Sequence, residues 1–121
     1  MNVFDSSALL AFVLGEPGAD TVERELAEGG VCGAVNWSEI AQQILAHGRN
    51  WDLTSALLRS YGLAVEPVVV ADAEWAAQRW RRGEGLSLAD RLCLAVGKRL
   101  EANVWTADTG WGEGGPIRQI R

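Results

Sequence analysis

The sequence predicts an α/β fold: a three-layer α/β/α sandwich around a parallel sheet of four to five short strands. Short apolar runs alternate along the chain with segments of helical periodicity, and glycine or proline stands at most junctions. Strands that alternate with helices pair in parallel through right-handed crossovers, which place helices on both faces of a sheet. No repeat or linker divides the 121 residues, so one domain is expected over residues 1–121.

The first elements are separated by breaks rich in glycine. Residues 1–5 are expected to form a strand, followed by an apolar helix over 6–14. A Gly-Glu-Pro-Gly break follows, in which Pro17 is placed to open a helix over 19–28. Two glycines end that helix, and the apolar run that comes next predicts a strand over 31–35.

The middle of the chain contains a strongly amphipathic segment, expected as a helix over 36–47. Its apolar residues recur at i, i+3, i+4, i+7 and i+8, namely Trp37, Ile40, Ala41, Ile44 and Leu45. A second helix is expected over 51–61. A short strand over 63–65 follows, and Pro67 stops it.

The last third repeats the alternation. A helix is expected over 70–82, and a more apolar, buried helix over 87–100. A strand over 103–106 precedes a glycine-rich loop, and residues 117–120 are expected to close the sheet as an edge strand.

Composition removes several classes of function. The net charge of −5 argues against a protein that binds nucleic acid through bulk positive charge, although metal ions among the acids would invert the local sign. Cys32 and Cys93 form no C-x-x-C motif, and His47 is the one histidine. The sequence therefore offers few ligands for a zinc site and few residues for a histidine-based catalytic triad. No membrane-length apolar run or secretory signal is seen, so a cytoplasmic location without membrane contact is expected.

Four acidic residues occupy comparable positions in the expected fold. Asp5 and Asp108 follow strands, whereas Glu39 and Asp90 fall in the first turn of helices. Strand carboxyl ends and the following helix starts share one edge of an α/β sheet, where the crevice lies. Four carboxylates there would repel one another without a cation, and hard divalent ions prefer oxygen ligands. The pattern therefore indicates a metal-dependent enzyme.

Each acid also has a structural interpretation. Asp5 at a strand-to-helix junction is a suitable N-cap. Glu39 and Asp90 each stand three residues after a capping residue, as in a capping box, and Asp108 could start a turn. Taken singly these alternatives are at least as good as metal binding, whereas taken together the four acids favour a shared site.

Several local strings resemble the PIN-domain ribonucleases, especially the VapC-type toxins of bacterial toxin–antitoxin pairs. The resemblance covers essentially the whole chain and is carried by residues 5–10, 15–18, 34–39, 85–95 and 104–108. The string around Asp90 and the Thr106-Ala107-Asp108 string are the most specific. Thr109 and Gly110 depart from the family pattern, in which a basic residue is frequent directly after the last acid.

The resemblance implies an endoribonuclease that depends on Mg²⁺ or Mn²⁺ and hydrolyses RNA phosphodiester bonds. It implies that this toxin is neutralised by a cognate antitoxin protein and forms a homodimer. The four acids would be the metal ligands and catalytic residues, with Ser6 and Thr106 orienting the carboxylates. The alternative is a catalytically inactive PIN-like module that binds RNA or protein.

RNA contacts would then come from local positive charge and one aromatic ring. The candidates are Arg81, Arg82, Arg91 and Trp111. Arg81 and Arg82 have an equally good role at a helix C-terminus, and Arg91 has one as a partner of Asp90. Trp111 suits base stacking from a glycine-rich loop, with core packing as the alternative.

Overall fold

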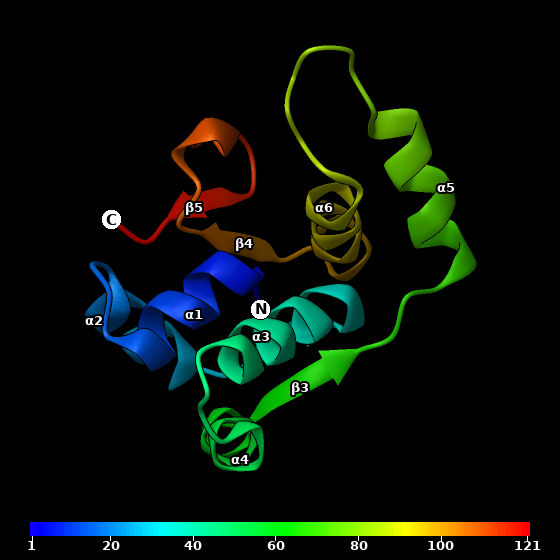
Figure 1. Cartoon of the computed structure of the whole chain (residues 1–121). Coiled ribbons are helices and arrows are strands. Elements are labelled where there is room, and N and C mark those ends of the chain that lie inside the picture. Colours follow the sequence, from blue (N-terminus) through cyan, green and yellow to red (C-terminus); the bar gives the residue numbers. More distant parts are fainter.

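Five parallel strands form one sheet in the order β3-β2-β1-β4-β5. Strand β3 lies on one side of the molecule, and β4 and β5 lie on the other (Figure 1). The computed structural model describes residues 1–121. The strands are β1 (Asn2–Phe4), β2 (Gly30–Gly33), β3 (Leu63–Glu66), β4 (Asn103–Thr106) and β5 (Ile117–Gln119). The fold class and the closing edge strand are therefore as the sequence predicts.

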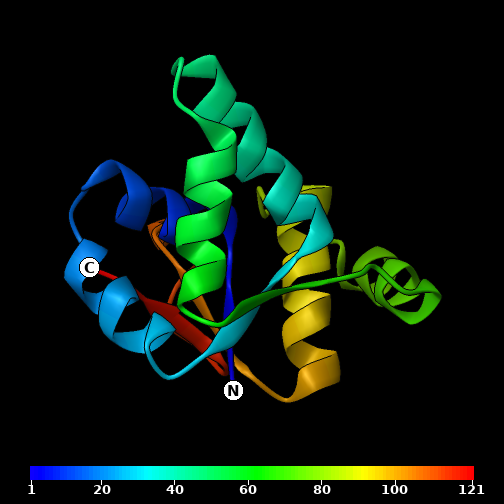
Figure 2. The same ribbon diagram turned by 90° about the horizontal axis from the view of Figure 1, so that it is seen from below.

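Helices cover both faces of this sheet. They are α1 (Ser6–Leu14), α2 (Ala19–Leu26), α3 (Ala34–Ala46), α4 (Trp51–Ser60), α5 (Val70–Arg79), α6 (Leu88–Leu100) and the 3₁₀ turn η1 (Thr109–Trp111). Helix α5 packs on the outside of α6, away from the sheet (Figure 2). None of these helices has the length and apolar character needed to cross a membrane.

The core is divided into two clusters because side chains alternate across each strand. Phe4 and Cys32 face the cluster built with α1 to α4, whereas their neighbours Val3 and Val31 face the cluster under α6. Both strands are thus buried on two sides, as expected for parallel strands between helical layers.

The strand order reverses at β1. From β1 the chain builds outward to β2 and β3 on one side, then returns to place β4 and β5 on the other. Strands β1 and β4 pair with Phe4 opposite Trp105, so Asp5 and Thr106 come at adjacent strand ends. Such a reversal is where ligands bind in open α/β sheets.

Three helix boundaries differ by two residues or more from the sequence expectation, and one of them is the end of α2, which lies at Leu26. Helix α3 begins at Ala34, two residues early, because β2 ends at Gly33, whose extended backbone forms the N-cap. Helix α5 ends at Arg79 because Trp80 returns to extended backbone.

An ion-pair cluster fixes the outer helix layer. Arg99 of α6 donates to both carboxylate oxygens of Asp72 at 3.0 and 3.1 Å, and to Glu66 at 2.7 Å. Asp72 is only 2% exposed, and burial raises its pKa, but the hydrogen bonds from Arg99, the backbone N–H of Val69 and the charge of Arg99 together lower it. The cluster therefore ties the end of β3 and the start of α5 to α6.

Candidate active site

Asp5 is the buried centre of the site. It directly follows β1 and caps α1, its Oδ1 accepting the backbone N–H of Ala8 at 2.8 Å. Oδ2 accepts the hydroxyl of Thr106 at 2.6 Å. The residue is 4% exposed. The capping role is thus present, and Oδ2, which accepts a single hydrogen bond, keeps a lone pair for a ligand.

Burial makes ionisation of Asp5 unfavourable. Desolvation raises its pKa from 3.8 to about 6, against the lowering effect of hydrogen bonds from Thr106, Ala8 and Ser7. The negative charge of Asp90 raises the pKa further. A carboxylate in this state gains more from a nearby cation than an exposed one would.

Glu39 projects from the second turn of α3. Its Oε1 accepts hydrogen bonds from the Asn36 amide at 2.8 Å and from the Ser6 hydroxyl at 3.1 Å. The capping-box alternative for Glu39 is wrong, because α3 begins at Ala34 and Glu39 lies too far into the helix to reach the N-cap. Buried Asn36 and half-buried Ser6 instead aim the carboxylate, with Oε2 unbonded.

Asp90 forms the capping box that the sequence allows. Its Oδ2 accepts the Ser87 N–H at 3.0 Å, and the Ser87 hydroxyl accepts the Asp90 N–H at 3.0 Å. The carboxylate is half-buried, and Oδ1 has no hydrogen bond. Asp90 therefore combines a structural contact with one oxygen free for a ligand.

Asp108 lies at the exposed rim of the site. It caps η1, with Oδ1 accepting the Gly110 N–H at 2.9 Å. Its backbone N–H is donated to the Thr106 hydroxyl at 3.0 Å. Thr106 thus links the first and last of the four candidate acids, Asp5 and Asp108.

Ser7 is a site residue that sequence reasoning did not select. Its hydroxyl donates to Oδ1 of Asp5 at 2.7 Å and accepts the Ala107 N–H at 2.9 Å. One side chain therefore ties the start of α1 to the end of β4. The available signal was the serine pair directly after Asp5.

Three of the four acids share one electrostatic environment. Burial raises the pKa of the Cys93 thiol, and the charges of Asp5, Asp90 and Glu39 raise it further. The hydrogen bond from Ser6 brings Glu39 to the start of α1, next to Asp5, and the charge of Asp90 also raises the pKa of Asp5.

The donor set suits a hard divalent cation. Each acid offers carboxylate oxygen, and three of them retain an oxygen without a hydrogen bond: Glu39, Asp90 and Asp108. No three His, Cys, Asp or Glu side chains are arranged to hold one ion directly. Mg²⁺ keeps several of its waters when bound, so these carboxylates could hold the ion through its waters without all contacting it directly.

Two of the candidate arginines are held by backbone carbonyls of α5. Arg81 donates to Gln78 O at 2.8 Å, which is the helix C-terminal role named as its alternative. Arg91 donates to Ala76 O at 2.6 Å, and it forms no ion pair with Asp90. Exposed Arg82 lies over the ring of Trp80 at 5.4 Å.

The structure places Trp111 in the core. It is 9% exposed and packs in the cluster under α6, which is the packing alternative, and this leaves little of its ring for stacking on a base. The exposed tryptophan is Trp80, at 48%, in the connection between α5 and α6. The sequence predicts a helix over 70–82 that includes Trp80, and this helix does not predict an exposed ring.

The sequence model of the PIN domain family matches residues 3–114 of the chain. No curated protein sequence matches.

Three solved structures have the same fold at low sequence identity. A toxin–antitoxin complex from Klebsiella pneumoniae has a TM-score of 0.78, covering 100% of this chain and 98% of that one at 16% identity. VapC20 of Mycobacterium tuberculosis is described as a sarcin–ricin loop cleaving toxin. It has a TM-score of 0.73, covering 94% of this chain and 95% of that one at 18% identity. FitAcB from Neisseria gonorrhoeae scores 0.65 over 100% and 97%, also at 18% identity.

Proposed function

Because this chain belongs to the PIN domain family, we propose that it is an endoribonuclease that depends on Mg²⁺ or Mn²⁺ and acts as the toxin of a toxin–antitoxin pair. The observation that carries the proposal is buried Asp5 at the reversal of strand order, with Glu39 linked to the start of α1 by the hydroxyl of Ser6. Asp5 is kept there although burial opposes its charge. Perturbed, buried acids in such a place are typical of catalytic sites.

The proposed roles follow from the hydrogen bonds. Asp5, Glu39, Asp90 and Asp108 would hold the ion, directly or through water. A bound divalent ion supplies Lewis acidity to the scissile phosphate and lowers the pKa of water for in-line attack. Thr106 and Ser6 orient the carboxylates of Asp5 and Glu39 through their hydroxyls.

The shape of the site suits a polymer. None of the five surface cavities is lined by any of the four acids, so the site is an open edge of the sheet rather than a closed pocket. An RNA strand can lie across such an edge with its phosphate against the acids. A small metabolite would find few walls there.

The biological setting rests on the fold. Structures with the same fold include a toxin–antitoxin complex and a toxin described as cleaving the sarcin–ricin loop. We propose that this chain pairs likewise with a cognate antitoxin, forms a homodimer and acts in the cytoplasm as a single nuclease domain. The alternative is an inactive PIN-like binding module. It is favoured by the observation that no three acidic side chains are arranged to coordinate one ion directly.

The test is cleavage of a mixed RNA pool by the pure protein in Mg²⁺, in Mn²⁺ and in EDTA. Asp90→Asn should abolish cleavage while the amide still caps α6, and exposed Asp52→Asn serves as the matched control. Metal-dependent cleavage that survives in Asp52→Asn and is lost in Asp90→Asn supports the nuclease. Absence of both cleavage and metal binding would favour the binding module.

A further inference from the structure

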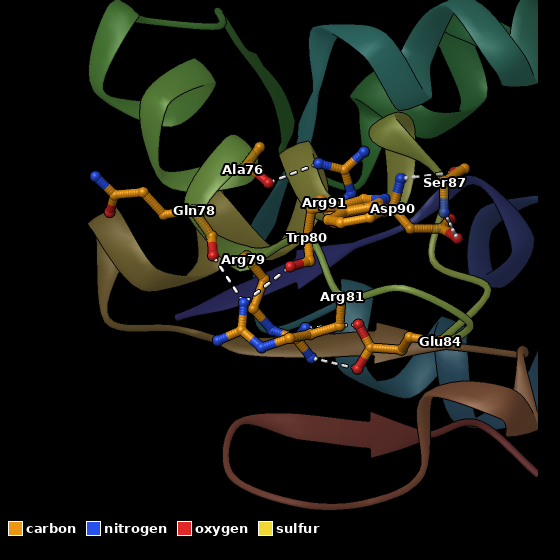
Figure 3. Close-up of polar contacts among 9 residues, drawn as sticks. All are labelled: Ala76, Gln78, Arg79, Trp80, Arg81, Glu84, Ser87, Asp90 and Arg91. Carbon is orange, nitrogen blue, oxygen red and sulfur yellow. Dashed lines mark hydrogen bonds and ion pairs between the residues drawn. The ribbon is translucent and has the colours of Figure 1, made fainter.

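The connection between α5 and α6, residues 80–87, concentrates positive charge just before Asp90. We call the sheet edge that carries Asp5, Glu39, Asp90 and Asp108 the acid edge. Four arginines surround the connection: Arg79, Arg81, Arg82 and Arg91. The carboxylate of Glu84 is bound by Arg79, near Arg81 (Figure 3). The hydrogen bond from Arg79 lowers the pKa of Glu84, and the charges of Arg81 and Arg91 lower it further. The connection then leads into the capping box of Asp90.

Glu84 takes both ends of one guanidinium. Nη1 of Arg79 donates to Oε1 at 2.6 Å, and Nη2 donates to Oε2 at 2.9 Å. This two-pronged geometry is the one that arginine also uses for phosphate. The two side chains are 31% and 33% exposed, so solvent and a ligand can reach the pair.

The other cations are positioned without Glu84. Arg81 is fixed by the carbonyls of Gln78 and Trp80, and Arg91 by that of Ala76 (Figure 3). These contacts are to neutral carbonyls, and neither Arg81 nor Arg91 forms an ion pair. Arg79 is therefore the arginine of this group whose charge is neutralised by an acid.

Glu84 is free to move away. Gly83 and Gly85 flank it, both with positive φ and with open space where a β-carbon would stand. An exposed ion pair contributes little to stability because water solvates and screens its members. Displacing the carboxylate from Arg79 would thus disturb little else in the fold.

We propose that Glu84 occupies, on Arg79, the position of an RNA backbone phosphate, and that it competes with RNA for this arginine. The proposal rests on the proposed nuclease function and assigns a phosphate-binding segment next to its acid edge. Exposed Trp80, with Arg82 over its ring, offers a base-stacking surface in the same segment. A site that combines phosphate and base contacts favours single-stranded RNA over an acidic peptide.

The experiment measures binding of a labelled single-stranded RNA of mixed sequence by fluorescence anisotropy. EDTA is present so that the RNA stays intact, and the measurement is repeated over a series of KCl concentrations. The variants are Glu84→Gln, Arg79→Gln and the double variant. The matched control is Glu28→Gln, an exposed acid after α2 whose replacement changes the net charge equally.

Glu84→Gln should bind RNA about threefold to tenfold more tightly than wild type, and its log–log salt slope should steepen by about 0.7, as for one added phosphate contact. Arg79→Gln should bind more weakly, and the double variant should show no gain over it. A gain no larger than that of Glu28→Gln, or one that persists without Arg79, would overturn the proposal.

Two further outcomes are distinguishable. If wild type neither binds nor cleaves RNA, the nuclease function fails and the proposal fails with it. If wild type binds RNA but Glu84→Gln tightens only the binding of labelled polyglutamate, the segment takes acidic peptide and the phosphate assignment is overturned.

Discussion

Asp5→Asn should make the metal-free protein more stable at neutral pH while it destroys the site. In the folded protein the pKa of Asp5 is raised to about 6 from 3.8 by burial. At about 1.36 kcal/mol for each pH unit, this difference corresponds to a cost of about 3 kcal/mol when the buried group is ionised. Asparagine carries no charge, and it caps helices as well as aspartate does.

The local contacts reduce that gain. The amide oxygen can keep the Ala8 N–H, but the amide nitrogen replaces the oxygen that accepts from Thr106, whose hydroxyl must turn to accept instead. We therefore expect a net gain of about 1–3 kcal/mol in the free energy of unfolding at pH 8.

The pH dependence identifies the cause. Because the folded pKa is raised, the wild type has its full stability below the unfolded pKa and loses it as pH rises through about 6. The advantage of Asp5→Asn should consequently be smaller by about 2 kcal/mol at pH 4.5 than at pH 8.

Urea unfolding in EDTA at pH 4.5 and pH 8 measures the difference in free energy of unfolding between Asp5→Asn and wild type. The exposed control, Asp52→Asn, should show neither the gain at pH 8 nor its dependence on pH. The reasoning is refuted if Asp5→Asn is less stable than wild type at pH 8. An advantage of equal size at both pH values would also refute it, because the ionisation of Asp5 could not then be the cause.

Three further substitutions test the framework. Ser7→Ala should lower RNA cleavage at least tenfold and cost about 1–3 kcal/mol on urea unfolding, since it removes a donor to Asp5 and leaves a backbone N–H unpaired. Arg99→Gln should cost about 2–4 kcal/mol because it leaves buried acid uncompensated; a loss under 1 kcal/mol would contradict this. Gly97→Ala would overlap Val104 and should cost about 1–3 kcal/mol, whereas Gly114→Ala, facing open space, should unfold as wild type does.

The sequence predicts the fold class well because parallel strands and amphipathic helices leave strong periodic signals. The strand over Asn103–Thr106 and the helices flanked by glycine agree with the structure to within a few residues. Boundaries are less certain where a small residue ends a strand. Gly33 permits α3 to start early, and that shift alone removes Glu39 from its expected capping position.

The positions of the site residues follow from the sequence, but their contacts do not. Strand ends and helix starts place the acids at one edge, whereas the bonds from Ser7 and Asn36 depend on side-chain directions that periodicity does not encode. Trp80 and Trp111 show the same limit. Their exposure is set by where α5 stops and how η1 folds inward.

The central claim is that the four acids form one metal site. Its most direct test is the affinity of the purified protein for Mn²⁺, measured by electron paramagnetic resonance. Wild type should bind Mn²⁺ in competition with Mg²⁺, and Asp5→Asn and Asp90→Asn should each weaken binding tenfold or more, while Asp52→Asn should bind as wild type does. Equal Mn²⁺ affinity in all four proteins would contradict the claim that these acids form one metal site.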